Sequence, residues 1–212
     1  MRPTRDNTAE TERVRKLQDR EARRYDRNIS IFERILFADG RRWVCEQARG
    51  HVLELAVGTA RNLPHYPADV TLSGIELSPE MLAIARRRAQ QLGRPADLRV
   101  GDAQALEFAD ESFDTVVCTL GLCTIPDPRR AVAEARRVLR RGGRLLLLEH
   151  VRSPVRAVRA IERLLDPLSV RFAADHLTRE PLDHLNDEEF MIESVERSRL
   201  GIVERVIARK PN

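Results

Sequence analysis

The sequence predicts a doubly wound α/β domain with a mainly parallel sheet, an antiparallel strand near its C-terminus and an N-terminal helical cap. Between residues 51 and 149, short apolar runs alternate with amphipathic helical stretches, which is typical of a parallel sheet covered on both faces. Residues 190–197 and 201–208 are strand-like runs separated only by a turn, and such neighbours pair antiparallel. Residues 1–48 have helical patterning and precede the first strand.

The composition bounds the class of protein. The chain has 212 residues, 42% of them hydrophobic and 33% charged, which is typical of one soluble globular domain with a small extension. Basic and acidic residues number 37 and 33, so the formal net charge is +4, and the two signs are interspersed along the chain. Aromatic residues make up only 4%. We therefore expect no nucleic-acid-binding surface.

The cysteines and the N-terminal stretch indicate the compartment. Three cysteines, none in a Cys-x-x-Cys pair, exclude a disulfide scaffold and suggest no zinc site. No apolar run approaches the roughly 20 residues of a membrane span, and Met1 to Ser30 are charged and polar, unlike a signal peptide. We therefore expect a cytoplasmic protein without a membrane span, and the sequence leaves its oligomeric state open.

The cap of residues 1–48 adjoins a single domain of residues 49–212. A charged stretch with a weak apolar stripe begins the cap, and a stronger amphipathic pattern follows and is interrupted near Gly40. No Pro/Gly-rich linker separates cap and domain. The cap is therefore expected to cover the domain rather than to fold as a second one.

The strands and helices of the domain follow from local signals. Ser78 and Pro79 begin a helix as N-cap and first helical residue, and Gly93 ends it. Asp127-Pro128 opens another helix, which is expected to end at Gly142-Gly143. A further helix is expected over residues 154–168, and a loop or short helix over 178–187. Five buried strands are predicted at residues 51–55, 70–75, 97–100, 113–118 and 144–149.

Small and acidic residues follow successive strands, at the edge where ligands of doubly wound sheets bind. Small residues at positions 56, 58 and 60 follow the first strand and let a ligand approach the backbone. Glu76 follows the second strand and is placed to accept hydrogen bonds from both hydroxyls of a ribose. Asp102 follows the third strand and is placed to accept one from an adenine amine. The combination predicts a cofactor that contains a nucleoside.

Other nucleotide cofactors fit the first loop poorly. The stretch Ala56-Val-Gly-Thr-Ala-Arg61 lacks the third glycine of the dinucleotide fingerprint, and Pro64 and Pro67 break the helix that would bind a pyrophosphate. The sequence contains no P-loop. NAD and nucleoside triphosphates are therefore disfavoured.

The sequence resembles class I S-adenosylmethionine-dependent methyltransferases over about residues 25–210. The resemblance implies a Rossmann-like sheet of seven strands, S-adenosylmethionine as cofactor and S-adenosylhomocysteine as product. The chain departs from the family at Ala56 and Ala60, where glycine is usual. The motifs that carry the resemblance are Val52-Leu-Glu-Leu-Ala-Val-Gly-Thr59, Gly74-Ile-Glu-Leu-Ser-Pro-Glu-Met81, Gly101-Asp-Ala-Gln-Ala-Leu106, Phe113-Asp-Thr-Val-Val-Cys118 and Arg137-Val-Leu-Arg-Arg-Gly-Gly-Arg-Leu145.

The same resemblance implies the cofactor contacts. Glu76 would bind the ribose, and Tyr25-Asp26 matches the Tyr-Asp element that closes over the cofactor in ubiquinone/menaquinone methyltransferases. Asn62 and Met81 belong to the same cofactor-binding set. The residues implied along the methionine part are Glu54, Ala56, Gly58 and Thr119. The residues implied around the adenine are Leu77, Asp102 and Ala103.

Motifs outside the cofactor loops are similar to those of the thiol S-methyltransferases of animals and their bacterial relatives, some of them termed phosphatidylethanolamine methyltransferases. This similarity implies S-methylation of a small thiol, with residues 151–187 as an acceptor-side insertion. The animal enzymes carry an N-terminal membrane anchor that this sequence lacks, which favours a soluble acceptor. The motifs are Val117-Cys-Thr-Leu-Gly-Leu-Cys-Thr124, Glu149-His-Val151, Leu165-Asp-Pro167 and Leu177-Thr-Arg-Glu180.

Two other functions stay open on the sequence. One is O- or N-methylation of a quinone, phenol, amine or phospholipid headgroup, and the other is a cofactor-binding module without catalysis. A nucleic-acid methyltransferase is disfavoured, because the segment after the fourth strand reads Cys118-Thr-Leu-Gly121 instead of an Asn/Asp-Pro-Pro-Tyr/Phe-type motif.

His150, just past the fifth predicted strand, is the candidate general base or thiolate stabiliser. The alternative is that it only orders the loop, since a thiol enzyme can work without a dedicated base. Asp175 and His176 are candidate acceptor-side residues, either as an orienting pair or as two polar loop residues. Cys118 and Cys123 are expected to be small buried apolar side chains. No spacing of His, Asp or Glu suggests a metal site.

Overall fold

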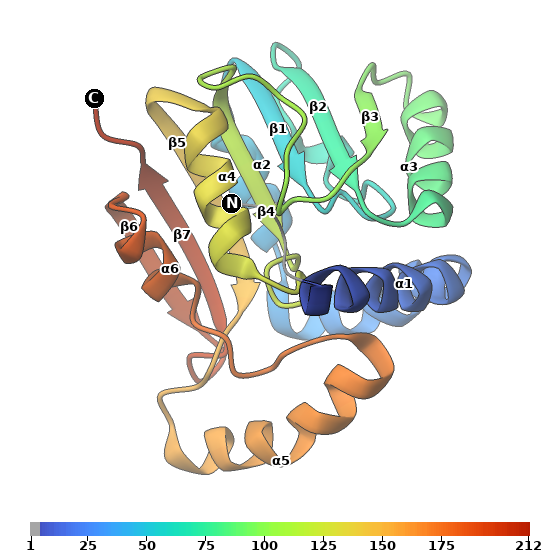
Figure 1. The fold of residues 1–212 in the computed structure, drawn as a ribbon, viewed down its shortest axis with the longest axis vertical. Coiled ribbons are helices and arrows are strands. Elements are labelled where there is room, and N and C mark those ends of the chain that lie inside the picture. Colours follow the sequence, from blue (N-terminus) through green and yellow to red (C-terminus); the bar gives the residue numbers. More distant parts are fainter. Residues whose placement is uncertain (1–4) are drawn as a thin grey trace.

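The computed structural model describes residues 5–212 and shows one seven-stranded sheet flanked by helices (Figure 1). The strand order is β3-β2-β1-β4-β5-β7-β6, and β7 runs antiparallel to both of its neighbours while the other pairs are parallel. The predicted fold class is thereby confirmed, and residues 1–4 of the expected cap lie outside the described residues. The strands are β1 His51–Leu55, β2 Thr71–Glu76, β3 Asp97–Val100, β4 Phe113–Thr119, β5 Leu139–His150, β6 Met191–Ser198 and β7 Val203–Arg209.

The two helices whose N-caps the sequence predicts begin at those caps. The Ser78 hydroxyl accepts a hydrogen bond from the Met81 amide at 3.1 Å, and the Asp127 carboxylate accepts one from the Arg130 amide at 3.2 Å. Within residues 5–212, no helix combines the length and the apolar character needed to cross a membrane. The helical segments are α1 Arg5–Phe32, the π-helical η1 Glu33–Phe37, α2 Gly40–Glu46, the 3₁₀ turn η2 Leu63–His65, α3 Pro79–Gln91, α4 Pro128–Val138, α5 Arg156–Ala173 and α6 Pro181–Asp187.

Two boundaries differ from the expectation: α5 extends to Ala173 instead of ending at Leu168, and the junction of α4 with β5 lies earlier than predicted. α4 ends at Val138 and β5 begins at the next residue, so Gly142-Gly143 lies within the strand and not at the end of the helix. The register between β4 and β5 shifts in this stretch, and Gly142 has a φ of +71°. Such a shift is typical of a β-bulge, and glycine adopts the left-handed backbone that it requires without strain.

The core forms one apolar layer on each face of the sheet. Alternate residues of a strand point to opposite faces. Leu53 and Leu147 therefore pack with residues of α4 and α6, whereas Val52 and Leu148 pack with residues of α2 and α3. Both faces are covered, so the carboxyl edge of the parallel strands is the place where a ligand reaches the sheet.

α1 crosses this carboxyl edge, and α5 lies further out beneath it (Figure 1). The Asp19 carboxylate accepts a hydrogen bond from the Ser78 hydroxyl after β2 at 2.5 Å, and the Asp26 carboxylate accepts one from the Thr59 hydroxyl after β1 at 2.6 Å. α5 contains no buried residue. The strand ends are thus roofed by one firmly attached helix and one loosely packed helix.

Candidate active site

A cavity of about 530 Å³ opens at the carboxyl edge of the sheet, between α1, α5 and the ends of four strands. The loop after β1 forms its floor together with Glu76, Thr119 and His150, which end β2, β4 and β5. A second, narrow cavity of about 20 Å³ shares Ala56 and Glu76 with it. The site therefore has a wide compartment and a narrow one, joined at Glu76.

Every second residue of the loop after β1 has a left-handed backbone conformation. Ala56, Gly58 and Ala60 have φ of 50°, 56° and 61°. Glycine adopts this conformation freely, whereas alanine is strained in it by about 1–2 kcal/mol. The two alanines therefore hold the loop in a backbone conformation that glycine adopts without strain. A Cβ added at Gly121, in the facing loop, would lie 3.0 Å from the Cβ of Ala56, so this part of the floor admits only small residues.

Glu76 has the geometry of a diol acceptor. It is only 2% exposed, and its two carboxylate oxygens accept hydrogen bonds from the backbone amides of Gly58 at 2.8 Å and Ser78 at 2.9 Å. Burial raises the pKa of Glu76, although the backbone amides offset part of this effect. Each oxygen keeps a further lone pair, so the carboxylate can accept two more hydrogen bonds from a ligand with neighbouring hydroxyls.

The narrow cavity brings together the three residues expected around the adenine, Leu77, Asp102 and Ala103. Val14 and Gln18 of α1 form its outer wall. A space of about 20 Å³ holds one water molecule. A purine therefore requires an outward movement of α1 or of its side chains.

Glu54 and Asn62, both assigned to the cofactor from the sequence, do not line either cavity. They form a buried layer under the floor. The Asn62 amide donates to the Glu54 carboxylate at 2.8 Å and to the Thr119 hydroxyl at 2.9 Å, and the Tyr66 hydroxyl donates to Glu54 at 2.8 Å. Burial raises the pKa of Glu54 to about 7. Of this group only Thr119 faces the cavity, and the others fix its position.

Tyr25 and Met81 line the wide cavity from α1 and α3. Burial raises the pKa of Tyr25 to about 12, so its hydroxyl is neutral at physiological pH. The next residue, Asp26, accepts hydrogen bonds from Thr59 and Arg88 and lies 3.6 Å from Arg61. The Tyr-Asp element thus combines one residue that faces the cavity with one that fastens α1 to the loop after β1.

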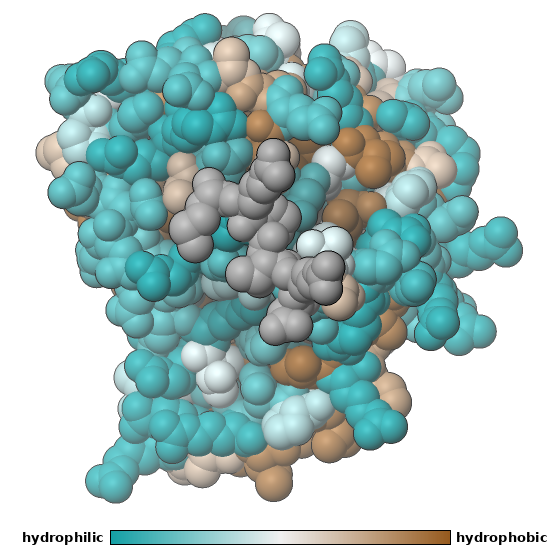
Figure 2. All heavy atoms as spheres, viewed as in Figure 1, coloured by the Kyte–Doolittle hydropathy of each residue, from teal (hydrophilic) through white to brown (hydrophobic). Residues whose placement is uncertain are grey.

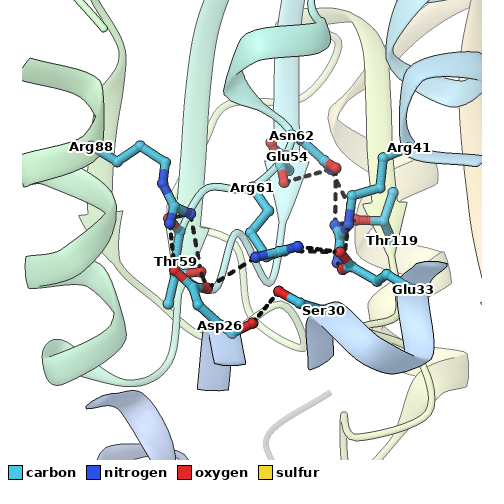
Figure 3. Close-up of polar contacts among 10 residues, drawn as sticks. All are labelled: Asp26, Ser30, Glu33, Arg41, Glu54, Thr59, Arg61, Asn62, Arg88 and Thr119. Carbon is cyan, nitrogen blue, oxygen red and sulfur yellow. Dashed lines mark hydrogen bonds and ion pairs between the residues drawn. The ribbon is translucent and has the colours of Figure 1, made fainter. Parts of the chain in front are cut away.

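A network of charged side chains, which sequence reasoning missed, continues from Asp26 across the cavity wall (Figure 3). Buried Glu33 accepts hydrogen bonds from Arg41 at 2.7 Å and from Arg61 at 2.9 Å. Arg41 also donates to Asn62 and to Thr119, both at 2.9 Å. The one available signal was an acid at position 33 within an amphipathic apolar pattern. Its partners come from distant parts of the chain, so spacing could not reveal them.

His150 and Asp175 lie in contact at the end of the wide cavity opposite Glu76. The Nε2 atom of His150 lies 2.7 Å from an Asp175 carboxylate oxygen, and both residues line the cavity. Burial lowers the pKa of His150, but the hydrogen bond and the charge of Asp175 outweigh it, so the pKa is raised above its usual value. The Nδ1 atom of His150 has no hydrogen-bond partner among the described residues. This arrangement can take up a proton from a bound ligand.

The neighbours of this pair differ from the sequence expectation. Asp175 pairs with His150 and not with the adjacent His176, whose amide donates to the Cys123 carbonyl at 3.0 Å and whose side chain does not line the cavity. Cys123 does line it, with its Sγ within 4.8 Å of the ligand atoms of His150 and Asp175. Burial raises the pKa of the Cys123 thiol well above its usual value, which keeps it neutral and unreactive.

A mainly parallel sheet with buried Glu76 between a narrow and a wide compartment, and with a His150–Asp175 pair in the wide one, suits an enzyme that binds a nucleoside cofactor beside a second reactant. Comparison with known proteins agrees. Residues 53–147 match a family model described as a methyltransferase domain. A phosphatidylethanolamine N-methyltransferase of Cereibacter sphaeroides is 40% identical over 140 residues, which cover 62% of this chain and 69% of that protein. The chain therefore belongs to the S-adenosylmethionine-dependent methyltransferase family.

Other relatives differ in their acceptors. A demethylmenaquinone methyltransferase of Thermotoga maritima is 37% identical over 63% of this chain and 60% of its own length. The thiol S-methyltransferase TMT1B of Rattus norvegicus is 31% identical over 66% of this chain and 59% of its own length. The chain thus spans less than two thirds of these two relatives. The crystal structure of an S-adenosylmethionine-dependent methyltransferase from Thermotoga maritima superposes with a TM-score of 0.69 at 23% identity, covering 92% of this chain and 98% of that one, which shows the shared fold.

The protein is therefore an S-adenosylmethionine-dependent methyltransferase of small molecules. The residues present fit this cofactor, because Glu76 offers a buried carboxylate to a diol at the point where the narrow compartment joins the wide one. The relatives name quinone, amine and thiol acceptors in turn. The names of the relatives therefore do not identify the acceptor of this chain.

Proposed function

We propose that this methyltransferase methylates the sulfur of a small, apolar thiol, with His150 as general base and Asp175 as the residue that orients it. The observation that carries the proposal is the 2.7 Å contact between His150 and Asp175 at the end of an apolar cavity. The pair resembles the His–carboxylate arrangement in which the acid fixes the tautomer and leaves the other ring nitrogen free to accept a proton.

We further propose how the cofactor lies in the two compartments. Glu76 accepts the ribose hydroxyls, and Leu77, Asp102 and Ala103 surround the adenine in the narrow cavity. Ala56, Gly58, Met81 and Thr119 face the methionine part under Tyr25. Glu54 and Asn62 act from beneath, through Thr119.

When bound, S-adenosylmethionine supplies a methyl group on a positively charged sulfur. His150 Nδ1 takes the proton of the acceptor thiol, and the acceptor sulfur forms the new bond to the methyl carbon. The electron pair of the broken carbon–sulfur bond would stay on the cofactor sulfur. An unperturbed thiol has a pKa of about 8.5, and the raised pKa of His150 brings the two groups closer, so the proton transfer costs little free energy.

The cavity also disfavours an anionic acceptor. The arginines that line it in the described part of the chain, Arg41 and Arg61, are both paired with buried Glu33. A phosphate group would find no free cation on this wall, and its burial would be costly. A hydroquinone or phenol is the second candidate, because it is apolar and also has to lose a proton to a base. The three cysteines are free thiols, which supports our assignment of the enzyme to the reducing cytoplasm.

The test is a screen for S-adenosylhomocysteine release with acceptors of matched size: an alkyl thiol, the alcohol and primary amine of the same chain length, a phenol and a hydroquinone. We expect turnover that is selective for the thiol and falls in His150→Gln. Cofactor affinity of both proteins is measured separately by calorimetry. Turnover of the hydroquinone but not of the thiol would replace the proposal with the second candidate.

A further inference from the structure

The outward surface of α5 is apolar along its length. Five residues at helical spacing form one stripe, and their exposed fractions lie between 48% and 75%. The helix itself has no buried residue and lies at the outer end of the molecule (Figure 1). Figure 2 shows hydrophobic residues along this lower edge of the molecule. The stripe, hereafter the α5 stripe, consists of Ile161, Leu164, Leu165, Leu168 and Phe172.

The acidic and the basic side chains of α5 lie on different sides of the helix. Its two acids are only partly exposed, because Glu162 accepts a hydrogen bond from the Ser153 amide at 3.0 Å and Asp166 accepts one from the Leu177 amide at 2.7 Å. Arg156, Arg163 and Arg171 are exposed beside the stripe and make no ion pair with the described residues. The solvent-facing side of the helix therefore combines apolar and positively charged groups without an acid.

The end of α1 and the start of η1 extend this surface at the cavity mouth. Ile31, Phe32 and Ile35 are between 57% and 59% exposed. Phe32 lines the cavity from one side and Phe172, at the end of the α5 stripe, lines it from the other. The apolar surface is thus continuous with the entrance of the cavity.

We propose that the α5 stripe and the end of α1 dock on the surface of a bilayer that contains anionic phospholipids, with the cavity mouth facing the membrane. A helix with an apolar face and arginines beside it is suited to lie in the interface between headgroups and acyl chains without spanning the membrane. Arginines close to an anionic surface add about 1 kcal/mol each. A second copy of the chain is a poorer occupant, because a two-fold contact of this surface with itself would bring unpaired arginines together.

This inference goes beyond the proposed function and does not depend on which atom is methylated. Its consequence is that an apolar acceptor dissolved in the bilayer can enter past Phe32 and Phe172 without crossing water. Docking and catalysis can also be measured separately, because Leu164, Leu168, Arg156 and Arg163 do not line the cavity.

The experiment is flotation of the full chain with vesicles of phosphatidylcholine alone and of phosphatidylcholine with phosphatidylglycerol, at low and high salt. We expect binding to the anionic vesicles that weakens with salt. Leu164→Gln/Leu168→Gln should lower the vesicle partition coefficient by at least about tenfold, because two exposed leucines no longer enter the interface. Arg156→Gln/Arg163→Gln should lower it by about fivefold per arginine, on anionic vesicles only.

The control is Leu92→Gln/Val100→Gln, which removes two apolar side chains elsewhere on the molecule that are 48% and 55% exposed and should leave the partition coefficient unchanged. Melting temperature and cofactor affinity establish that each variant is folded. Absence of binding to anionic vesicles, or equal loss in the control variant, would overturn the proposal. It would also be overturned if light scattering showed a dimer that Leu164→Gln/Leu168→Gln dissociates.

Discussion

Replacement of Glu76 by alanine tests the cofactor assignment, because this carboxylate joins the two compartments. Its oxygens each accept one backbone amide and keep one lone pair for a ligand hydroxyl. A hydrogen bond to a charged group is worth about 1.5–3 kcal/mol. Loss of two such bonds therefore costs about 3–6 kcal/mol of binding free energy, which raises the dissociation constant roughly 10²- to 10⁴-fold.

Isothermal titration with S-adenosylhomocysteine measures this loss directly. The Gly58 and Ser78 amides lose their partner too, so the melting temperature without ligand is measured in parallel. Glu80→Ala is the control, because it removes an exposed acid from the first turn of α3 without touching either cavity. If a folded Glu76→Ala protein bound S-adenosylhomocysteine within threefold of wild type, the ribose assignment would be refuted.

Three other changes follow from the charged groups of the site. Asp175→Asn removes the charge that raises the pKa of His150, so the acidic limb of the pH–rate profile should move to lower pH while the maximal rate falls; an unmoved limb would contradict the pairing. Glu54 has a pKa of about 7 in the folded state, above its unfolded value. The folded state therefore retains a proton that the unfolded state releases, and the stability that this proton contributes is lost as pH rises from about 4.5 to 7. Melting curves of Glu54→Gln should lack that part of the decline, and identical slopes in both proteins would argue against it. Asp26→Asn breaks the ion pairs with Arg88 and Arg61 and should weaken cofactor affinity about fivefold, since such a partly exposed contact is worth about 1 kcal/mol; Asp97→Asn, at an exposed pair with Arg99, should leave it unchanged.

Local signals predicted most of the fold. Ser78 and Asp127 cap their helices as expected, because an N-cap depends on a side chain and an amide three residues away. The start of β5 was placed too late, since a glycine pair that commonly ends a helix serves here at a register shift whose partner strand lies far away in sequence. Glu76 and Asp102 were expected near a ligand because each follows a predicted strand, and both line a cavity. The reason is that the carboxyl ends of parallel strands share one edge of the sheet.

Contacts between distant residues were beyond reach of the sequence. Glu33, Arg41 and Arg61 form one network across three segments, and no spacing along the chain brings them together. The sequence offers the adjacent His176 as a partner for Asp175, but the fold pairs Asp175 with His150, 25 positions away. Glu54 looked like a cavity residue, yet its carboxylate is used by Tyr66 and Asn62 beneath the floor.

The role of His150 as the base for a thiol acceptor is best measured by the methylation rates of two thiols in wild type and His150→Ala. One is an alkyl thiol that is protonated at neutral pH, and the other is an aromatic thiol that is already ionised. General-base catalysis contributes about 10²- to 10⁴-fold, so the alkyl thiol should lose that factor while the aromatic thiol is nearly unaffected. Equal losses for both thiols would mean that His150 positions the acceptor and does not take its proton.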